Sequence, residues 1–585
     1  IGLLRSNVTL DEARAELAAV AAQLAADYPA DNEGWSVRLV TFDDWLLPRQ
    51  VRDSLVVLQG AVLLVLLIAC INVANLLFAR GVARQKETAI RVAMGASRGR
   101  IIWHGLMESA LLALAGAVTG VGLAAVAVRV LSVYAANVVP RVEEASIDWV
   151  VLSFALACAL VSAAAFGLLP SMQAAREHGQ TLHETSRGSG GRGRERIRAG
   201  LTVVEVSLSV ALLIGAGLLL RSFITLQQVD AGFDVDAVMT GRVLAASATD
   251  FDTRAERRAF WDRVTAEVAL LPGITGVSTI SLVPLGRGNT STEIEVPGAP
   301  AVPGVQPSAD WRVVAPGYFD TMGIPVRGRD FTQADGIDAP PVIIVSEVLA
   351  RQYWPNEDPI GKTIIASSMG NRARTVIGVV GDVRSSGLDR EIRPMVYYSE
   401  VEVGWSGQMY LVWRSALDPR SHIAAVRDTI RRVNTQVAFY DVKPAAELLS
   451  DSFRSRRLNL YLLGLFGGVA ATLAVIGLFG VMAYLVSQRT REIGVRLALG
   501  ATREEVFRVV IGRGLALAAI GAAIGVIIAA WLTRLMESLL FSVSRVDPVM
   551  FTAVPIAMVA VAVFACYVPA RRAMQVDPMI ALRAE

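Results

Sequence analysis

The sequence predicts a polytopic α-helical membrane protein with seven spans and an α+β extracytoplasmic domain, built from two repeats in one chain. Three observations lead to this fold class. Hydrophobic residues make up 53% of the 585 positions and the mean hydropathy is +0.48, well above soluble proteins. Several long apolar segments interrupt the polar sequence, and a charged stretch between two of them occurs a second time near the C-terminus.

Seven apolar segments are long enough to cross a bilayer, which needs about 20 apolar residues. They lie at about 55–79, 107–133, 149–170, 200–220, 458–486, 512–536 and 549–569. Loop 80–105 carries six Lys or Arg against one acid, and loops 171–199 and 487–511 are also rich in arginine. The positive-inside rule therefore places these loops and the C-terminus in the cytoplasm, with the segment 222–457 extracytoplasmic.

The repeated stretch runs from Arg84 to Arg98 and returns 405 residues later, from Arg489 to Arg503. Seven of its fifteen positions are identical. The repeat extends beyond this stretch, because Asp148 and Pro170 match Asp547 and Pro569 at an offset of 399. Each half therefore ends in the same unit: a span, a cytoplasmic elbow, a second span, a short outer loop and a third span.

The elbow has the pattern of a helix, a turn and a new helix. Arg84, Glu87 and Arg91 share one helical face, as do their equivalents Arg489, Glu492 and Arg496. Gly95 and Gly500 suit the left-handed turn that ends a helix, and Thr502-x-x-Glu505 is a capping box that starts the next one. A duplicated charged face favours a docking surface; topology-determining charge with ordinary helix pairing is the alternative.

Small and charged residues inside the spans give further hypotheses. Gly116-x-x-x-Gly120 matches Gly521-x-x-x-Gly525, and such pairs permit close helix packing, either between the halves or within one half. Glu205 lies about two turns into its span and is expected to reach the membrane interface. Glu108 and Arg513 occupy the same repeat position, which suggests an ion pair across the halves.

The remaining segments are predicted to fold outside the membrane. Thr9-Leu-Asp-Glu12 predicts a capped helix running to about Asp27, and the alternation over 35–40 predicts a strand. In the outer segment we expect helices at about 252–271 and 420–434. Strands are expected at 341–345, 375–380 and 409–413. This mixture without a long apolar run predicts an α+β domain.

These features divide the chain into six parts. They are the end of a first extracytoplasmic domain (1–50), a first three-span unit (51–185), a basic glycine-rich linker (186–199), a leading span (200–221), the outer domain (222–457), and a second three-span unit with its tail (458–585). The first half shows no leading span and the chain begins at Ile1, so we expect a missing N-terminal part.

The sequence contains no pattern typical of a catalytic, metal-binding or nucleotide-binding site. Cys70, Cys158 and Cys566 all lie in apolar segments and predict neither disulfides nor a metal site. The stretch 356–363 ends in Gly-Lys-Thr like a phosphate-binding loop but begins with Asn356 instead of glycine. Basic residues lie beside apolar spans, so no nucleic-acid partner is expected. The sequence therefore predicts a non-enzymatic protein without cofactors.

The elbow resembles that of MacB/FtsX-type permeases of ABC transporters. The resemblance rests on Arg-x-x-Glu-Ile-Gly-x-Arg-x-Ala-Leu-Gly-Ala-Thr at 489–502 and its copy at 84–97. Further similar stretches lie at 316–325, 327–331, 353–362, 379–384 and 570–583. Two units in one chain look most like the duplicated orphan permeases first noted in acidobacteria.

The resemblance implies a permease in the bacterial inner membrane whose two units pair within the chain. A separate cytoplasmic ATPase would bind ATP and dock at the elbows, around Glu87, Arg91, Gly95 and Ala96 of the first copy and around Glu492, Arg496, Gly500 and Ala501 of the second. A periplasmic adaptor or an outer-membrane component would be a further partner. The favoured function is mechanotransmitting efflux; the alternatives are a mechanotransmitter that activates an extracytoplasmic partner, and an orphan scaffold without ATPase.

Overall fold

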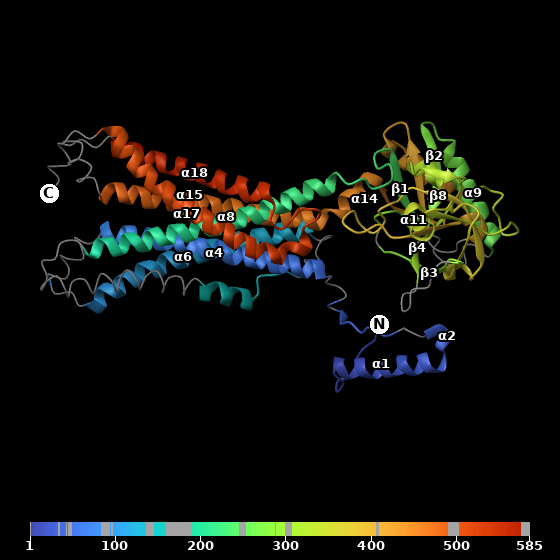
Figure 1. Ribbon diagram of the computed structural model, residues 1–585, viewed down its shortest axis with the longest axis horizontal. Helices are drawn as coiled ribbons and strands as arrows, with labels where there is room; N and C mark the ends of the chain where they lie inside the picture. Colours follow the sequence, from blue (N-terminus) through green and yellow to red (C-terminus); the bar gives the residue numbers. More distant parts are fainter. Residues whose placement is uncertain are drawn as a thin grey trace. The chain divides into compact units, whose positions relative to one another are not determined.

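The computed structural model contains two compact units (Figure 1). The outer unit comprises Ile1–Leu39 and Leu226–Arg454, and the helical unit comprises Val40–Thr225 and Ser455–Glu585. The structure describes residues 2–32, 36–42, 44, 49–83, 94, 98–135, 145–158, 189–244, 253–286, 288–298, 307–404, 409–488 and 502–574.

Six long helices dominate the helical unit, and each is apolar enough to cross a membrane. They are α4 (Arg49–Ala83), α6 (Arg98–Ala135), α8 (Ser189–Gln227), α15 (Arg454–Gln488), α17 (Arg503–Leu532) and α18 (Pro548–Met574). A short 3₁₀ segment, η4 (Thr533–Leu539), follows α17. Six of the seven predicted spans are thereby confirmed. The seventh is described only over the apolar helix Trp149–Cys158, so it stays a prediction.

Helix α8 begins earlier than the sequence suggested. We expected a flexible linker over 186–199, whereas the helix already starts at Ser189. Adding residues to an existing helix is far easier than starting a new one, so the apolar span extends backwards through the basic segment. The predicted linker is therefore largely the first part of α8, and Arg198 is buried there.

The outer unit contains a four-stranded antiparallel sheet with two helices packed against it. In chain order its elements are β1 (Val238–Leu244), α9 (Arg254–Ala269), β2 (Ile274–Ile280), β10 (Met409–Ser415), α13 (Ile423–Val433) and β11 (Ala438–Pro444). The strand order β11-β1-β10-β2 is that of a ferredoxin-like fold, with 281–408 inserted between β2 and β10. Trp413, Val264 and Ile430 are among the residues in the core between this sheet and its helices.

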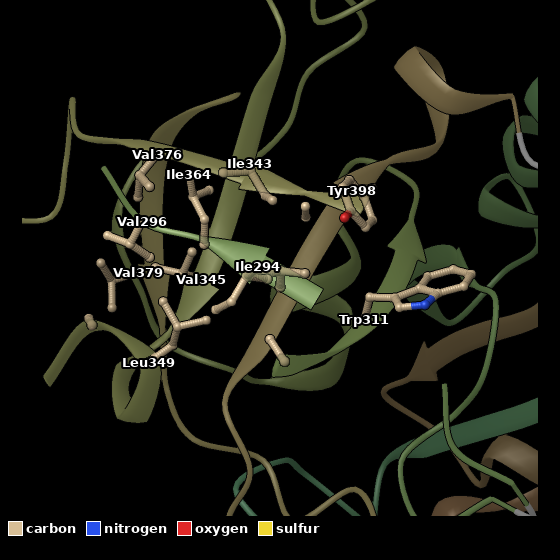
Figure 2. Packing of buried hydrophobic residues seen from close by; sticks show 14 of the residues in the cluster. Ile294, Val296, Trp311, Ile343, Val345, Leu349, Ile364, Val376, Val379 and Tyr398 are labelled. Carbon is tan, nitrogen blue, oxygen red and sulfur yellow. The ribbon is translucent and has the colours of Figure 1, made fainter. Parts of the chain in front are cut away.

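The inserted segment forms a closed ring of six strands. They are β3 (Ser291–Glu295), β4 (Ser308–Val314), β6 (Val342–Ser346), β7 (Thr363–Ala366), β8 (Ala373–Val380) and β9 (Met395–Ser399). The parallel pairing of β4 with β9 closes the ring. Figure 2 shows Ile343, Val345 and Ile364 among the aliphatic side chains that fill its interior. Closure leaves these strands without a free edge, which limits edge-to-edge association.

Short elements complete the outer unit. They are α1 (Leu10–Asp27), α2 (Pro29–Asn32), α10 (Tyr318–Met322), β5 (Val326–Gly328), α11 (Glu347–Tyr353), η2 (Ser367–Met369), α12 (Glu400–Val403), η3 (Pro419–His422) and α14 (Ala445–Ser452). The predicted cap of the first helix is confirmed, because Thr9 and Glu12 form the capping box of α1.

Most of the predicted elements of the outer domain are confirmed, and one predicted strand is wrong. Helices α9 and α13 match the expected 252–271 and 420–434, and β6, β8 and β10 match the three expected strands. Residues 36–40 form no strand, although their side chains alternate. Alternation alone does not stabilise a strand, because the backbone needs a neighbouring strand to pair with, and none of the described strands pairs there.

Candidate functional site: the helix interface between the two repeats

The predicted docking elbows lie outside the described residues. This applies to all ten of their named positions, Arg84, Glu87, Arg91, Gly95, Ala96, Arg489, Glu492, Arg496, Gly500 and Ala501. The helix that follows the second elbow is described. Thr502 caps α17, with its Oγ accepting from the Glu505 backbone N–H at 3.3 Å, and the Glu505 carboxylate accepts from the Thr502 N–H at 3.1 Å. The predicted capping box at this helix start is confirmed.

The glycine pair of the second repeat lies against α8. A Cβ atom added to Gly521 would lie 2.8 Å from the Cβ of Val206, and one on Gly525 would lie 2.6 Å from the Ser207 carbonyl oxygen. Real Cβ atoms do not approach so closely, so α17 and α8 can pack this tightly only with glycine at both positions. This contact lies within the second half of the chain.

The equivalent glycines of the first repeat have different surroundings. A Cβ on Gly116 or Gly120 of α6 would meet no atom of the described structure within 4 Å. The repeated Gly-x-x-x-Gly pattern therefore has two environments. In the second repeat its partner is α8, and no described helix packs in that way against α6.

Equivalent residues of the two repeats contact each other where α4 meets α15. Asn459 is the counterpart of Ser54 at the 405-residue offset, and its Nδ2 donates to the Ser54 Oγ at 2.9 Å. Gly477 is the counterpart of Asn72 at the same offset, and a Cβ on Gly477 would lie 2.6 Å from the Asn72 Oδ1. Residues related by a two-fold axis meet their own counterparts only beside that axis. The pseudo-two-fold axis of the repeats therefore passes between α4 and α15.

A buried polar cluster lies at this axis. Asn72 of α4 donates through Nδ2 to the Glu205 Oε1 of α8 at 2.5 Å and to the Leu473 carbonyl of α15 at 2.9 Å. Glu205 is 0% exposed and Asn72 is 5% exposed. The expectation that Glu205 reaches the membrane interface is wrong, because its carboxylate points between α4 and α15. A second contact joins the same helices, since the Ser209 hydroxyl donates to the Ala470 carbonyl at 3.0 Å.

Arg198 extends the polar cluster by two turns of α8. Its Nη2 donates to the Asn75 carbonyl of α4 at 2.8 Å, and its guanidinium carbon lies 3.9 Å from the centre of the Tyr484 ring of α15. A guanidinium over an aromatic face is a favourable cation–π arrangement. One helix from the second half, α8, thus holds α4 of the first repeat against α15 of the second.

A further set of polar contacts joins the other ends of these helices. Arg221 of α8 pairs with Asp547, the residue before α18. The Ser222 hydroxyl accepts from the Phe541 backbone N–H at 2.8 Å, and the Ser538 hydroxyl of η4 donates to Asp53 of α4 at 2.8 Å. These contacts attach α8 and α4 to the segment 538–547 that lies between α17 and α18.

Two other sequence hypotheses have different outcomes. The Glu108–Arg513 pair stays a prediction, because the side chain of Glu108 lies outside the described residues. In the near-match to a phosphate-binding loop, Lys362 pairs with Glu357 at 2.6 Å and Thr363 starts strand β7. A phosphate-binding loop leads into a helix N-terminus, so this segment has the wrong architecture. Within the described residues no three His, Cys, Asp or Glu side chains group into a metal site.

Sequence reasoning did not identify Asn72, Asn75 or Arg198. A signal was present for the asparagines, since both interrupt the apolar segment 55–79. Polar side chains within spans usually face other helices rather than lipid. Which helix they face depends on contacts between residues more than 100 positions apart, as with Asn72 and Glu205, and a single sequence does not reveal such contacts.

Comparison with known proteins defines the class of this molecule. Residues 60–178 and 464–578 each match the FtsX-like permease C-terminal family, and residues 199–433 match the MacB-like periplasmic core domain. The two permease matches correspond to the two repeats and flank the outer domain. The fold and these matches define a multi-pass membrane permease of the ABC-transporter type.

The chain belongs to the MacB/FtsX-type permeases, with two permease repeats in one polypeptide. It is 25% identical over 268 residues to "Pyoverdine export ATP-binding/permease protein PvdT" of Pseudomonas savastanoi pv. phaseolicola, covering 44% of this chain and 40% of that protein. It is 27% identical over 271 residues to "Macrolide export ATP-binding/permease protein MacB" of Marinobacter nauticus, covering 44% and 41%. The chain thus spans about two fifths of the length of these relatives.

Among solved structures, the chain is similar to the periplasmic region of MacB from Actinobacillus actinomycetemcomitans. That match has 15% sequence identity and a TM-score of 0.26, and covers 39% of this chain and 96% of the other. The extracellular domain of the ABC-type transporter YknZ from Gram-positive bacteria matches at 16% identity with a TM-score of 0.24, covering 34% and 100%.

Proposed function

We propose that this chain is the permease subunit of an ABC-type export system that couples a separate cytoplasmic ATPase to movement of the outer domain. In this proposal the partner binds ATP, since the near-match to a phosphate-binding loop at 356–363 lacks its first glycine. The names of the relatives, which combine export with ATP binding and permease function, support this assignment. The protein would lie in the bacterial inner membrane. Its elbows and C-terminus would be on the cytoplasmic side, and residues 222–457 would be extracytoplasmic.

One observation carries the coupling step of this proposal. The segment Leu226–Arg454 of the outer unit is continuous in sequence with α8 at its N-terminal end and with α15 at its C-terminal end, and only Phe453 separates α14 from α15. These two helices contact each other directly, through Ser209 and the Ala470 carbonyl. A displacement of α15 relative to α8 would therefore change the separation of the two chain ends of the outer domain.

The elbows are the proposed place where the ATPase acts. Each elbow joins two spans of its repeat, α4 to α6 and α15 to α17. The second elbow leads directly into α17, whose first turn is stabilised by a capping box. An ATPase that closed on both elbows would draw the two repeats together or apart at their shared α4–α15 contact. A periplasmic adaptor or outer-membrane component would receive the resulting movement of the outer domain.

The test is reconstitution of the full chain in nanodiscs with an ATPase encoded beside it. We expect the wild-type permease to stimulate ATP hydrolysis, and Glu492→Lys or Gly500→Pro to abolish both stimulation and co-purification. Thr472→Ala serves as the control, because this residue of α15 is exposed and, within the described part of the chain, its hydroxyl bonds only to the Gly468 carbonyl of its own helix. Equal stimulation by wild type and both elbow variants would exclude the elbow as the docking site.

A transport assay separates export from signalling to an extracytoplasmic partner. In proteoliposomes containing the permease and its ATPase, we expect ATP-dependent movement of the exported compound across the bilayer. Compounds that alter the ATPase rate provide the candidates. ATP hydrolysis that is stimulated by the permease but moves none of these compounds would favour the non-transporting mechanotransmitter instead.

A further inference from the structure

Different residue types of the two repeats meet at the pseudo-two-fold axis, whereas a symmetric dimer would have identical residues there. In a two-fold dimer of identical units, a residue beside the axis meets a second copy of itself. Here Ser54 meets Asn459, and Asn72 meets Gly477. The two repeats have therefore become chemically different at the positions that decide which units can pair.

The Asn72 position illustrates this difference most clearly. Gly477 provides the space that Asn72 and Glu205 occupy, because a Cβ there would lie 2.6 Å from both the Asn72 Oδ1 and the Glu205 Oε1. Contacts this short are not tolerated by real Cβ atoms. Asn72 in turn supplies the amide donor to the Glu205 carboxylate, at 2.5 Å. One repeat provides the donor, and the other provides both the acceptor and the space.

We propose that Asn72, Glu205 and Gly477 are the specificity-determining residues that make the first repeat fit the second repeat rather than a further copy of itself. The occupant of the α4 face is thus the α8–α15 pair of the second repeat. This inference concerns pairing of the repeats and holds independently of the ATPase and of the transported compound.

Both alternative pairings are unfavourable for a physical reason. Two copies of the first repeat would bring one Asn72 against another, in the space that only a glycine leaves open. Two copies of the second repeat would place Gly477 against Gly477, and Glu205 would lose the amide that donates to it. A buried carboxylate inside a membrane is costly without such a donor. Only the mixed pairing both fits the space and gives the Glu205 carboxylate an amide donor.

Cysteine reporters at the axis distinguish the pairings in the full chain. In a background with Cys70, Cys158 and Cys566 replaced by alanine, Ser54→Cys with Asn459→Cys reports mixed pairing as a crosslink within one chain. Asn459→Cys alone reports like pairing, in which the second repeat of one chain pairs with the second repeat of another, as a crosslinked dimer of two chains. With a short bifunctional maleimide in membranes, we expect efficient crosslinking within the double reporter and less than a tenth as much dimer from the single one.

The substitutions then test the three residues. We expect Asn72→Gly to lower the mixed crosslink at least threefold and raise the like-paired dimer, and Gly477→Asn to lower the mixed crosslink to a similar degree. The double exchange, Asn72→Gly with Gly477→Asn, should recover at least half of the wild-type yield, because the asparagine enters the space vacated at position 72 and the Glu205 carboxylate, at the end of a flexible side chain, shifts to accept from it. Thr472→Ala is the control on the same helix and should leave both yields unchanged.

Two results would overturn the proposal. One is a mixed crosslink that stays at the wild-type level in both single variants. The other is a double exchange that elutes as a single species in detergent but crosslinks no better than Gly477→Asn alone. Recovery in the double exchange is expected only if these residues determine pairing, and not if they have a general structural role.

Discussion

Arg329 and Asp335 form a two-pronged ion pair in the outer domain, with Nη1 2.8 Å from Oδ2 and Nη2 2.8 Å from Oδ1. The Asp335 side chain is only 8% exposed and also accepts from the Thr332 backbone N–H at 2.8 Å. Hydrogen bonds from Arg329, together with those from Thr332, hold the pKa of Asp335 below its ordinary value of 3.8. The same pair raises the pKa of Arg329. The arrangement fixes the loop that follows β5.

The first prediction concerns the pH dependence of this loop. Since the pKa of Asp335 is lower in the folded chain than in the unfolded one, the pair stabilises fully above about pH 5 and its contribution is lost as the pH falls through the folded pKa. Asp335→Asn should lower stability at pH 7 by about 1–2 kcal/mol and flatten the acid-side loss. Thermal unfolding of the full chain in detergent between pH 3 and 7 measures both effects.

The neighbouring Asp330 supplies the control for that prediction. Burial raises the pKa of Asp330, although the carboxylate accepts from the backbone N–H groups of Phe331 and Gly317. A raised pKa works in the opposite direction, so the ionised form of Asp330 costs stability at neutral pH. The Asp330 carboxyl therefore adds stability as the pH falls below its folded pKa, and Asp330→Asn removes this contribution. Stability should consequently fall more steeply on acidification in Asp330→Asn than in wild type, whereas it should fall less steeply in Asp335→Asn. An equal acid-side loss in both variants would contradict the assignment.

The second prediction concerns a buried ion pair in the six-strand ring. Arg374 of β8 donates to Glu402 of α12 at 3.0 Å, and the two side chains are 2% and 5% exposed. The guanidinium also lies 4.9 Å from the centre of the Tyr398 ring. Arg374→Met leaves the Glu402 carboxylate buried without its partner, so we expect a loss of about 3–5 kcal/mol. Hydrogen–deuterium exchange of β8 and α12 in the full chain provides the measurement.

Removing both charges tests the explanation. Replacing a whole buried pair by apolar residues of similar size is often close to neutral, whereas removing one partner is not. Arg374→Met with Glu402→Met should therefore recover at least half of the stability lost by Arg374→Met alone. A double variant as unstable as the single one would show that packing of the arginine stem, and not the unpaired carboxylate, causes the loss.

Local sequence signals predicted the elements of this protein well, because each of these signals acts within one segment. Length and apolarity identified six spans, and Thr-x-x-Glu patterns identified the capped starts of α1 and α17. The strand expected at 35–40 shows the limit of such signals, since alternation does not supply a pairing partner. Helix α8 shows another limit, because its basic N-terminal part had the composition of a linker and is helical.

The polar cluster could not be predicted for a different reason. Glu205 was placed correctly within its span, but its surroundings depend on α4 and α15, which are distant in sequence. The repeated glycines make the same point. Identical Gly-x-x-x-Gly motifs lie in two environments, and only the fold shows that Gly525 faces α8 whereas Gly120 meets no described atom.

The third prediction uses this difference between equivalent glycines. A Cβ on Gly525 would lie 2.6 Å from the Ser207 carbonyl oxygen and 2.8 Å from the Val210 Cβ. Gly525→Ala should therefore destabilise the helical unit by about 1–3 kcal/mol. Gly120→Ala, at the matching position of the first repeat, should leave stability within about 1 kcal/mol of wild type, because alanine favours a helix and no described atom lies in its way. Unfolding in mixed detergent micelles compares the two, and equal losses would contradict tight α17–α8 packing.

The fourth prediction concerns Asp547, which has two roles at the start of α18. Its Oδ1 accepts from the backbone N–H groups of Val549 and Met550, both at 3.0 Å, and its carboxylate pairs with Arg221 of α8. Asp547→Ala removes the cap and the pair, so we expect a loss of about 2 kcal/mol or more. Asp547→Asn keeps an acceptor for the cap and should cost less than half as much. Amide exchange at 549–552 follows the cap, and detergent unfolding follows the whole unit.

Asp148 is the matched control, because it has the equivalent position in the first repeat and, within the described residues, makes only the capping contact. Its Oδ1 accepts from the Val151 backbone N–H at 2.8 Å, at an exposed site. Asp148→Ala should therefore speed exchange at the start of its own helix and leave unfolding of the unit almost unchanged. Equal global losses from Asp148→Ala and Asp547→Ala would mean that the cap alone accounts for the effect. A larger loss from Asp547→Ala, reproduced in part by Arg221→Ala, would show that α18 is held to α8 by this pair, next to the point where α8 leads into the outer domain.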